Sequence, residues 1–502
     1  MPGHWIIEHQ AMLETLFLVL IYALSIVAGF KVITQTSQPA KALGYLMLLF
    51  FIPGIGLLIY VGIGENRRIN KIYDRKLFRD LKRYDQVKKR ITAHSQENFS
   101  THEQELSKFS NVIHLLMKDT LSPLTQHNEV RVLVNGEAKF PAVIRALKAA
   151  EHHIHLEYYI FESGLIGDEI RAILIEKAKA GVEVRFIYDD FGSKRIRRKW
   201  IKELKTSGAQ AFPFYKVHFF ANRLNYRNHR KIIIIDGKTG FVGGINVSDR
   251  YSNLLPKRPK YRMSSQPSSA NTLYWRDTHL QISGSAVSSL QYGFLSDWSF
   301  ASGQDVEFHE SFFPKLSVHT KTLVQIASSG PDSLNPSIML ASNAIIHNAR
   351  DYVYFTTPYF IPNESVYDAI RTAALGGLDV RMLVPGRSDS WLVNKAASAY
   401  YEDLLNCGVK IYRYQKGFIH AKTLVTDDSL AMVGSANMDN RSFELNFETN
   451  AIVYDREVAV QLKEQFLSDL DDSMLLDADL WQNRRPFTKL QESVARLLSG
   501  VL

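Results

Sequence analysis

The hydrophobic pattern of the chain begins with two long apolar runs. Residues 15–30 form an uncharged run that is marginal for crossing a bilayer alone, and Val32 and Ile33 extend it. Residues 42–64 carry no charge and would measure about 34 Å as a helix, enough to cross a bilayer. Pro53 is expected to kink this second run, which membrane helices tolerate. Because the linker is short, the pattern predicts a transmembrane helical hairpin over residues 1–64; a pair of buried soluble helices is the alternative.

Basic residues cluster directly after the second apolar run. Many positions between Glu65 and Asp85 are Lys or Arg, whereas the linker holds no basic residue between Lys31 and Lys41. Cytoplasmic loops carry the excess of positive charge, so we expect the N-terminus and the chain after Gly64 to face the cytoplasm. Residues 65–128 are then a basic juxtamembrane segment, either on anionic headgroups or solvated, followed by a helical connector.

Further along, short apolar segments of strand length alternate with helical patterns. The order is strand, helix, strand at residues 153–161, 168–180 and 182–188, and it returns at residues 351–360, 366–374 and 378–384. Alternating strands and helices are typical of α/β layers around a mostly parallel sheet, and the duplication predicts two similar α/β/α lobes. We place the first lobe at residues 129–312 and the second at residues 313–502.

Two segments do not fit this repeat. Residues 254–273 are rich in Pro, Ser and Lys and predict a loop inserted in the first lobe. Residues 489–502 have apolar positions at helical spacing, so the second lobe is expected to end in an amphipathic tail. The tail either packs on the core or contacts the membrane, and packing on the core is the simpler expectation.

A motif of His, Lys and Asp at fixed spacing occurs twice, once in each predicted lobe. The copies consist of His229, Lys231 and Asp236, and of His420, Lys422 and Asp427. Each His is followed 17 positions later by an Asn at the end of a turn of small residues, Asn246 and Asn437. Two matched copies are far rarer by chance than one. The plain alternative is a pair of ordinary strands that each bury a His.

The spacing within the motif indicates different roles for its residues. The β-branched run after Lys231 predicts a buried strand. Because side chains alternate along a strand, His229 and Lys231 share one face, and Asp236, with the opposite parity, falls off it. The second copy has the same parity. We therefore expect His and Lys to carry the chemistry, and Asp236 and Asp427 to support the motif structurally.

The duplicated motif resembles that of the phospholipase D superfamily, whose members pair two such motifs across a pseudo-two-fold axis and cleave or exchange phosphodiesters through a phosphohistidine. Residues 274–279, 357–362, 437–443 and 444–448 further resemble the bacterial cardiolipin synthase family within it. The resemblance covers most of the chain from about Glu129 onward. It implies a phosphatidyltransferase that joins two phosphatidylglycerols into cardiolipin and releases glycerol. It also implies His229 as nucleophile and His420 as general acid, while the pseudo-symmetry leaves the opposite assignment open.

The residues of the two motifs suit chemistry on a phosphodiester anion. Such a reaction needs a nucleophile, an acid for the leaving alkoxide and positive charge around the phosphorus. Lys231 and Lys422 can hold the non-bridging oxygens as cations, and Asn246 and Asn437 can add neutral donors. The remaining His and acidic residues are scattered without metal-ligand spacing, so neither a metal nor another cofactor is expected.

A nucleophilic His also needs an acceptor that holds its second ring nitrogen. Two carboxylates downstream of the motifs, Asp277 and Glu448, fit this role. For Asp277 the alternative is a surface salt bridge with its neighbour Arg276, and Glu448 has a similar alternative.

The formal net charge of +9 indicates an anionic partner. With the predicted hairpin, phosphatidylglycerol and anionic membrane lipid are the expected partners and nucleic acid is not, in an enzyme of the cell membrane with cytoplasmic lobes. The single cysteine, Cys407, fits a reducing compartment. Three other functions stay open: a membrane-bound phospholipase D or nuclease that uses water, a phosphatidyltransferase with another acceptor, and a membrane scaffold with an inactive site.

Overall fold

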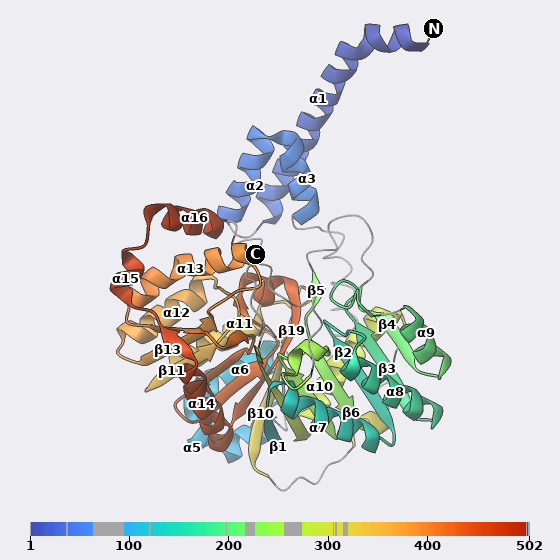
Figure 1. Ribbon diagram of the computed structural model, residues 1–502, viewed down its shortest axis with the longest axis vertical. Coiled ribbons are helices and arrows are strands. Elements are labelled where there is room, and N and C mark those ends of the chain that lie inside the picture. The colour runs from blue at the N-terminus through green and yellow to red at the C-terminus, as the bar shows by residue number, and fades with distance from the viewer. Residues whose placement is uncertain are drawn as a thin grey trace. The chain divides into compact units, whose positions relative to one another are not determined.

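The computed structural model describes residues 2–36, 39–63, 95–119, 122–196, 198–215, 226–255, 274–304, 306, 309–314, 320–497 and 499 (Figure 1). The basic stretch after Gly64 and nearly all of the predicted loop at residues 254–273 lie outside these residues. Contacts divide the chain into a small unit that holds residues 1–75 and a larger unit that holds most of the remainder.

The small unit contains three helices, α1 (Pro2–Gln35), α2 (Pro39–Phe51) and α3 (Pro53–Ile63). Among the described helices only α1 is long and apolar enough to cross a membrane, over Met12–Gln35. The second apolar run, predicted as one kinked span, is broken at Ile52 instead, because Pro53 has no amide hydrogen to continue the helix and restricts the residue before it. Helices of 13 and 11 residues are too short to span a hydrocarbon core of about 30 Å.

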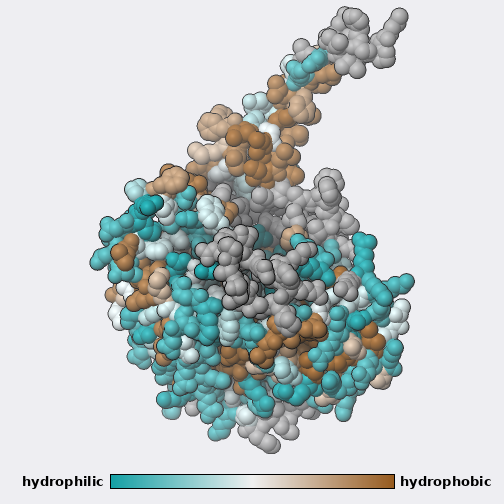
Figure 2. All heavy atoms as spheres, in the orientation of Figure 1, coloured by the Kyte–Doolittle hydropathy of each residue, from teal (hydrophilic) through white to brown (hydrophobic). Residues whose placement is uncertain are grey.

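The two short helices fold back on each other and on α1. The rings of Tyr45 and Tyr60 meet edge to face at 5.6 Å, and a Cβ on Gly56 would lie 2.4 Å from the carbonyl oxygen of Leu48. Val32 of α1 is buried in the same cluster. The outward side chains of α1 are apolar and exposed, as Figure 2 shows along this part of the chain. An exposed apolar surface of this kind marks a contact with a membrane or with another protein.

In the described part of the larger unit, sixteen strands form one sheet. Its strands, read from one edge, are β20 (Ser473–Leu475), β14 (Lys410–Tyr414), β13 (Asp379–Pro385), β11 (Tyr352–Thr356), β16 (Thr423–Thr426), β17 (Leu430–Gly434), β19 (Asn446–Tyr454), β10 (Thr322–Ser329), β1 (Thr125–Val134), β9 (Thr278–Gly284), β7 (Thr239–Gly243), β6 (Lys231–Ile235), β2 (His153–Tyr158), β3 (Glu183–Tyr188) and β4 (Gln210–Pro213), while β5 (Arg227–Asn228) pairs with β19 outside this order. Two small sheets pair β12 (Phe360–Ile361) with β18 (Met438–Asp439), and β15 (Gly417–Ile419) with β8 (Tyr274–Arg276).

The sheet has the same construction on both sides of its central β1–β10 pair. Each side continues through three antiparallel strands, which are β9, β7 and β6 on one side and β19, β17 and β16 on the other. Each side then adds three strands that are parallel to one another, β2, β3 and β4 or β11, β13 and β14. The sheet is therefore mixed rather than mostly parallel. The motif strands turn back in tight hairpins, β6–β7 and β16–β17, which short connections force to be antiparallel.

The helices of the larger unit cover both faces of the sheet. They are α5 (Glu103–Leu106), α6 (Ser110–Asp119), α7 (Asn135–Ala149), α8 (Leu165–Lys179), α9 (Arg198–Thr206), α10 (Val287–Ser302), α11 (Ser337–Asn348), α12 (Glu364–Leu375), α13 (Trp391–Asn406), α14 (Arg456–Asp471), α15 (Ala478–Gln482) and α16 (Pro486–Leu497). Ile233 and Ile235 of β6 lie in one core cluster with α7, α8 and α9. On the opposite face, a Cβ on Gly240 of β7 would lie 2.7 Å from Leu290 of α10. Helix, sheet and helix thus form three layers.

The connector predicted at residues 65–128 takes part in the core. Phe109, Val112 and Leu116, from the start of α6 and the turn before it, are buried in one cluster with Phe355 of β11. The first strand, β1, begins at Thr125, four residues before the predicted boundary. The end of the connector is therefore integral to the fold.

The C-terminal tail packs less than the sequence suggests. Ala495 of α16 lies in a small buried cluster with Ile361 and Ala396, so one side of the helix is held on α13. Leu490 and Leu497, which the apolar pattern assigns to the packed face, are 58% and 83% exposed. The described part of the apolar stripe therefore points outward.

The two motif Asp residues close the hairpins at the far end of the motif strands. Asp236 accepts amide hydrogens from Glu151, His152 and His153, at 3.0, 2.7 and 2.9 Å. Asp427 accepts the corresponding three, from Arg350, Asp351 and Tyr352, at 2.9, 3.0 and 3.2 Å. The five residues of β6 separate Asp236 from His229 by about 17 Å of strand, so the structure places Asp236 away from the motif His.

Replacing Asp236 with Ala should destabilise the first half of the sheet by about 2 kcal/mol or more, because three amide donors lose their acceptor. The measurement is the midpoint of unfolding of the detergent-solubilised chain, followed by tryptophan fluorescence. Asp236→Asn is the matched control, since Asn keeps one acceptor oxygen and tolerates the positive φ of 54° at this position. An unchanged midpoint in Asp236→Ala would show that the three bonds do not stabilise the hairpin.

Candidate active site

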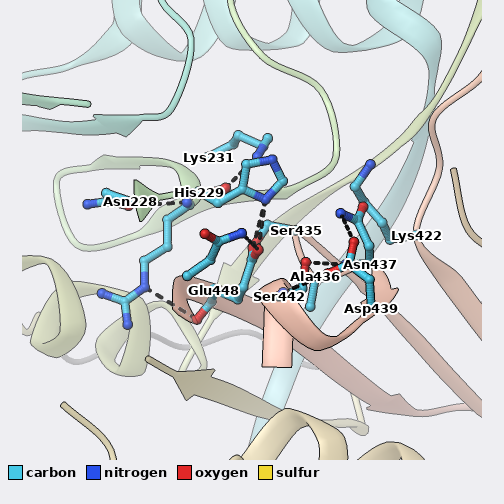
Figure 3. Close-up of polar contacts among 12 residues, drawn as sticks. Asn228, His229, Lys231, Lys422, Ser435, Ala436, Asn437, Asp439, Ser442 and Glu448 are labelled. Carbon is cyan, nitrogen blue, oxygen red and sulfur yellow. Dashed lines mark hydrogen bonds and ion pairs between the residues drawn. The ribbon is translucent and has the colours of Figure 1, made fainter. Parts of the chain in front are cut away.

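His229 follows β5, a short strand of the first half that pairs in parallel with β19 of the second half. Its amide donates to the carbonyl of Phe447 at 2.9 Å, which fixes the backbone. Its Nδ1 lies 2.8 Å from Oε1 of Glu448, a residue of β19 that is fully buried (Figure 3). The carboxylate that holds the first motif His therefore comes from the second half of the chain.

His420 has the reciprocal arrangement. It follows β15 of the second half, which pairs in parallel with β8 of the first half. Its amide donates to the carbonyl of Arg276 at 2.7 Å, and its Nδ1 lies 2.8 Å from Oδ2 of the buried Asp277. Each half of the chain thus positions the histidine of the other.

Both motif histidines lie just before the motif strands rather than within them. β6 begins at Lys231 and β16 at Thr423, because the residues before them pair with the opposite half instead. The two motif lysines turn back toward the histidines, and the ammonium groups of Lys231 and Lys422 donate to the carbonyls of His229 and His420. Figure 3 shows His229 and Lys231 beside Lys422 and Asn437 of the second half.

Burial sets the protonation of the two histidines. It lowers the pKa of His229 to about 4 and that of His420 to about 3, and the neighbouring motif lysines act in the same direction. Burial alone would raise the pKa of Glu448, but its histidine and lysine neighbours hold it below its usual value. A carboxylate can only accept, so Nδ1 of His229 carries the hydrogen and Nε2 keeps its lone pair at neutral pH.

Burial also makes the two motif lysines easier to deprotonate. Burial lowers the pKa of Lys231 to about 7 and that of Lys422 to about 8, although the carboxylates Asp277 and Glu448 oppose the shift in both cases. The charge of Lys422 further lowers the pKa of Lys231, so the two motifs share one electrostatic environment. An anion bound between them would favour the charged form of both.

The two motif Asn residues occupy corresponding places but have different partners. Nδ2 of Asn246 donates to the hydroxyl of Tyr251 at 2.7 Å, and its Oδ1 accepts the amide hydrogen of Ile160 at 3.1 Å. Nδ2 of Asn437 donates to Oδ2 of Asp439 at 2.9 Å. Each amide retains one N–H for a further acceptor.

Asp277 is not engaged in the salt bridge that the sequence left open. It is fully buried against His420, while Arg276 pairs with Asp469 of α14 at 2.8 Å. This pair also crosses from the first half of the chain to the second. A second buried pair joins Arg230 to Asp297 of α10.

Several residues that line the site carry no signal in the motif spacing. The ring of Tyr159 lies 4.8 Å from that of His229, and the ring of Trp275 lies 5.4 Å from that of His420. Lys139 is fully buried and donates to the carbonyl of Ile245 at 2.6 Å, directly before Asn246. Tyr251 lies five residues after Asn246, but the corresponding residue after Asn437 is Ser442, so the motif spacing indicates neither Tyr251 nor Lys139.

Within the described residues, no three His, Cys, Asp or Glu side chains are grouped so that they could hold a metal ion.

Known proteins are similar to this chain in sequence and in fold. Residues 143–254 and 343–470 match the family described as cardiolipin synthase, PLD-like domain. The cardiolipin synthase of Alkalihalophilus pseudofirmus is 37% identical over 96% of this chain and 93% of its own length. The major cardiolipin synthase of Bacillus subtilis is 38% identical over 98% of this chain and 99% of its own length. The crystal structure of phosphatidylserine synthase from Haemophilus influenzae has the same fold, with a TM-score of 0.57 at 13% identity, over 79% of this chain and 100% of that one.

Removing the charge of Lys422 should raise the pKa of Lys231, because the two ammonium groups repel each other across the site. The measurement is an NMR titration of carbon-13-labelled lysine in detergent, with Lys231→Met to assign the signal and Lys422→Met as the test. We expect Lys231 to titrate near pH 7 in the unaltered chain and at higher pH in Lys422→Met. Lys410→Met is the control, because the Lys410 side chain of β14 is half exposed and pairs with Asp379. An equal shift in both variants, or none in either, would contradict a shared site.

Proposed function

Because the chain belongs to the cardiolipin synthase family, we propose that it transfers the phosphatidyl group of one phosphatidylglycerol to a hydroxyl of a second, giving cardiolipin and glycerol. The observation that carries this proposal is the reciprocal pairing of two buried histidines with carboxylates of the opposite half, Glu448 and Asp277. A site built in this way can present two neutral imidazoles and two lysines to one substrate phosphate.

We propose that Lys231, Lys422, Asn246 and Asn437 bind the non-bridging oxygens of that phosphate. The lysines point back toward the histidines, and each Asn keeps an N–H that no described protein atom accepts. These groups are buried, so their interactions with an anion are stronger than they would be in water. Asp236 and Asp427 have a different role and support the hairpins.

In the first step, Nε2 of His229 attacks the phosphorus of the donor lipid, and the bond from phosphorus to the glycerol oxygen breaks. His420 gives its proton to the departing oxygen. The free enzyme holds His420 neutral, and the phosphate anion in the site favours its protonated form. Glu448 stabilises the charge that develops on His229.

In the second step, the hydroxyl of another phosphatidylglycerol attacks the phosphorus while the bond to His229 breaks. His420, now neutral, takes the hydroxyl proton. Water competes with the alcohol at this stage, and the burial of all four motif His and Lys side chains limits its access. The acceptor hydroxyl must therefore lie beside His420, which takes its proton.

We also propose that the two halves are related by a pseudo-two-fold axis that passes between β1 and β10. Support comes from the matching order of the six strands that follow this pair on each side, to which the second side adds β20 at its edge. It also comes from the matched bonds of the two histidines, the two lysines and the two hairpin Asp residues.

We further propose that α1 anchors the enzyme in the cell membrane and that the larger unit works in the cytoplasm, where it meets phosphatidylglycerol and other anionic lipid. Support comes from the exposed apolar surface of α1 and from the basic residues between Glu65 and Asp85. Because α2 and α3 fold back on each other, a single crossing by α1 puts the N-terminus on the far side of the bilayer. A hairpin with two crossings, as the sequence predicts, would keep the N-terminus in the cytoplasm.

The function is tested by product analysis with labelled phosphatidylglycerol vesicles and the intact chain. We expect cardiolipin and free glycerol in equal amounts, and no cardiolipin from His229→Ala or His420→Ala. Asp427→Asn, which alters a hairpin away from the site, should retain transfer and serves as the matched control. Phosphatidic acid as the dominant product would show that the site uses water and would contradict the proposal.

The topology is tested by labelling cysteines in intact cells with an impermeant maleimide. A cysteine introduced at Gly3 should react from outside, whereas the natural Cys407 in the larger unit should react only after the cells are opened. Protection of the cysteine at position 3 would support the two-crossing hairpin instead. Labelling of Cys407 in intact cells would contradict the cytoplasmic placement.

A further inference from the structure

The two half-sites differ at the second residue after each motif Asn. In the first half, Phe161 forms a bridge with Val247, and in the second half Phe360 pairs with Met438 in the same parallel sense. Val247 and Met438 each directly follow a motif Asn. Ser248 therefore corresponds to Asp439 in the two half-sites.

The acceptor atoms of the first half-site are occupied by protein bonds. Both ends of the Asn246 amide have partners, Tyr251 and the amide of Ile160. The hydroxyl of Ser248 donates to Glu162 at 2.6 Å, and Arg195 neutralises this carboxylate from 3.0 Å. The first half thus offers a substrate few free acceptor atoms.

The second half-site keeps acceptors available. Oδ1 of Asn437 is buried and has no hydrogen-bond partner among the described residues. Asp439 is 5% exposed, and among the described residues its two oxygens take hydrogens from neutral groups, Nδ2 of Asn437 and the amide of Ser442. The cations Lys422 and Arg441 interact with it electrostatically. A buried acceptor without a donor costs about 1–3 kcal/mol, so a ligand that supplies the donor is favoured there.

Acceptor oxygens distinguish an alcohol from a phosphate. A phosphodiester anion has no hydrogen to donate, and the carboxylate of Asp439 repels it. A glycerol headgroup has two neighbouring hydroxyls that can donate to both acceptors. Asn437 lies in the same half as His420, which takes the proton of the incoming hydroxyl in the proposed reaction.

We propose that Asp439 and Oδ1 of Asn437 form the subsite for the diol of the acceptor alcohol, so that the enzyme selects a glycerol headgroup over water. One hydroxyl of the acceptor donates to Asp439, and the other donates to Oδ1 of Asn437 until it attacks the phosphorus on His229. The new phosphorus–oxygen bond replaces the phosphorus–nitrogen bond, and the proton goes to His420. This inference rests on the proposed function and adds the group that sets its acceptor specificity.

The test is the ratio of cardiolipin to phosphatidic acid formed from phosphatidylglycerol vesicles by the full chain. Both products pass through the same intermediate on His229, so a purely structural change lowers them together and leaves the ratio unchanged. Misfolded protein contributes to neither product. Asp439→Asn should lower the ratio by about tenfold or more, as expected for the loss of a hydrogen bond to a charged group. Asp439→Ser, which copies the residue of the first half, should do the same.

Glu162→Gln is the matched control, because it neutralises the buried carboxylate at the corresponding place of the first half. It should leave the ratio within about twofold of the unaltered chain, the scatter expected for a group outside the subsite. A second readout adds isotope-labelled glycerol and propanol in excess. The unaltered chain should form labelled phosphatidylglycerol in preference to phosphatidylpropanol, and Asp439→Asn should lose this preference.

Two results separate the inference from the function on which it rests. If the unaltered chain makes cardiolipin but Asp439→Asn and Asp439→Ser keep both the ratio and the preference for glycerol, only the inference is wrong. An equal change of the ratio in Glu162→Gln would also overturn it. If the unaltered chain makes phosphatidic acid alone and exchanges neither alcohol, the proposed function and the inference fail together.

Discussion

Each reactive histidine of this fold depends on a carboxylate from the other half of the chain. Glu448 on β19 holds His229, and Asp277 beside β8 holds His420. A buried imidazole and a buried carboxylate are each costly alone and are tolerated together. Neither pair can form unless β5 lies on β19 and β15 lies on β8. The association of the two halves and the assembly of the site are therefore one event.

Burial explains why these groups suit phosphoryl chemistry near neutral pH. It keeps both histidines neutral and brings the pKa of Lys231 and Lys422 to about 7 and 8. A neutral imidazole with its Nδ1 hydrogen on a carboxylate has a free Nε2, which is the state a nucleophile or general base requires. When the substrate anion binds, it raises the pKa of both lysines and so favours their charged form. The two halves share this framework and differ around Asp439. There the second half keeps acceptor oxygens available, whereas the corresponding oxygens of the first half accept hydrogen bonds from the protein.

The sequence indicated the reacting groups more reliably than their surroundings. The spacing from His229 to Asn246, repeated from His420, predicted the duplicated motif, and alternation along the strand separated Asp236 from the chemistry. The spacing of residues within a motif cannot show which carboxylate bonds to which histidine. Glu448 reaches His229, and Asp277 reaches His420, only because strands of opposite halves pair in the folded structure. The antiparallel hairpins were missed for a similar reason, since a buried β-branched run has no direction. Hydropathy found the apolar run at residues 42–64 but not its fold back at Pro53, which depends on the contacts of Tyr45 and Gly56.

In the proposed mechanism, one site across both halves forms a covalent intermediate on His229, with His420 as the proton donor and acceptor. The sharpest test uses His420→Ala with a phosphatidyl ester of p-nitrophenol, whose leaving group needs no proton. Without His420 to activate the acceptor, the intermediate should accumulate. Digestion at neutral pH and mass spectrometry should then locate the phosphatidyl group on His229, and His229→Ala should carry none. An adduct on His420 in His229→Ala, or no adduct in either variant, would contradict this account.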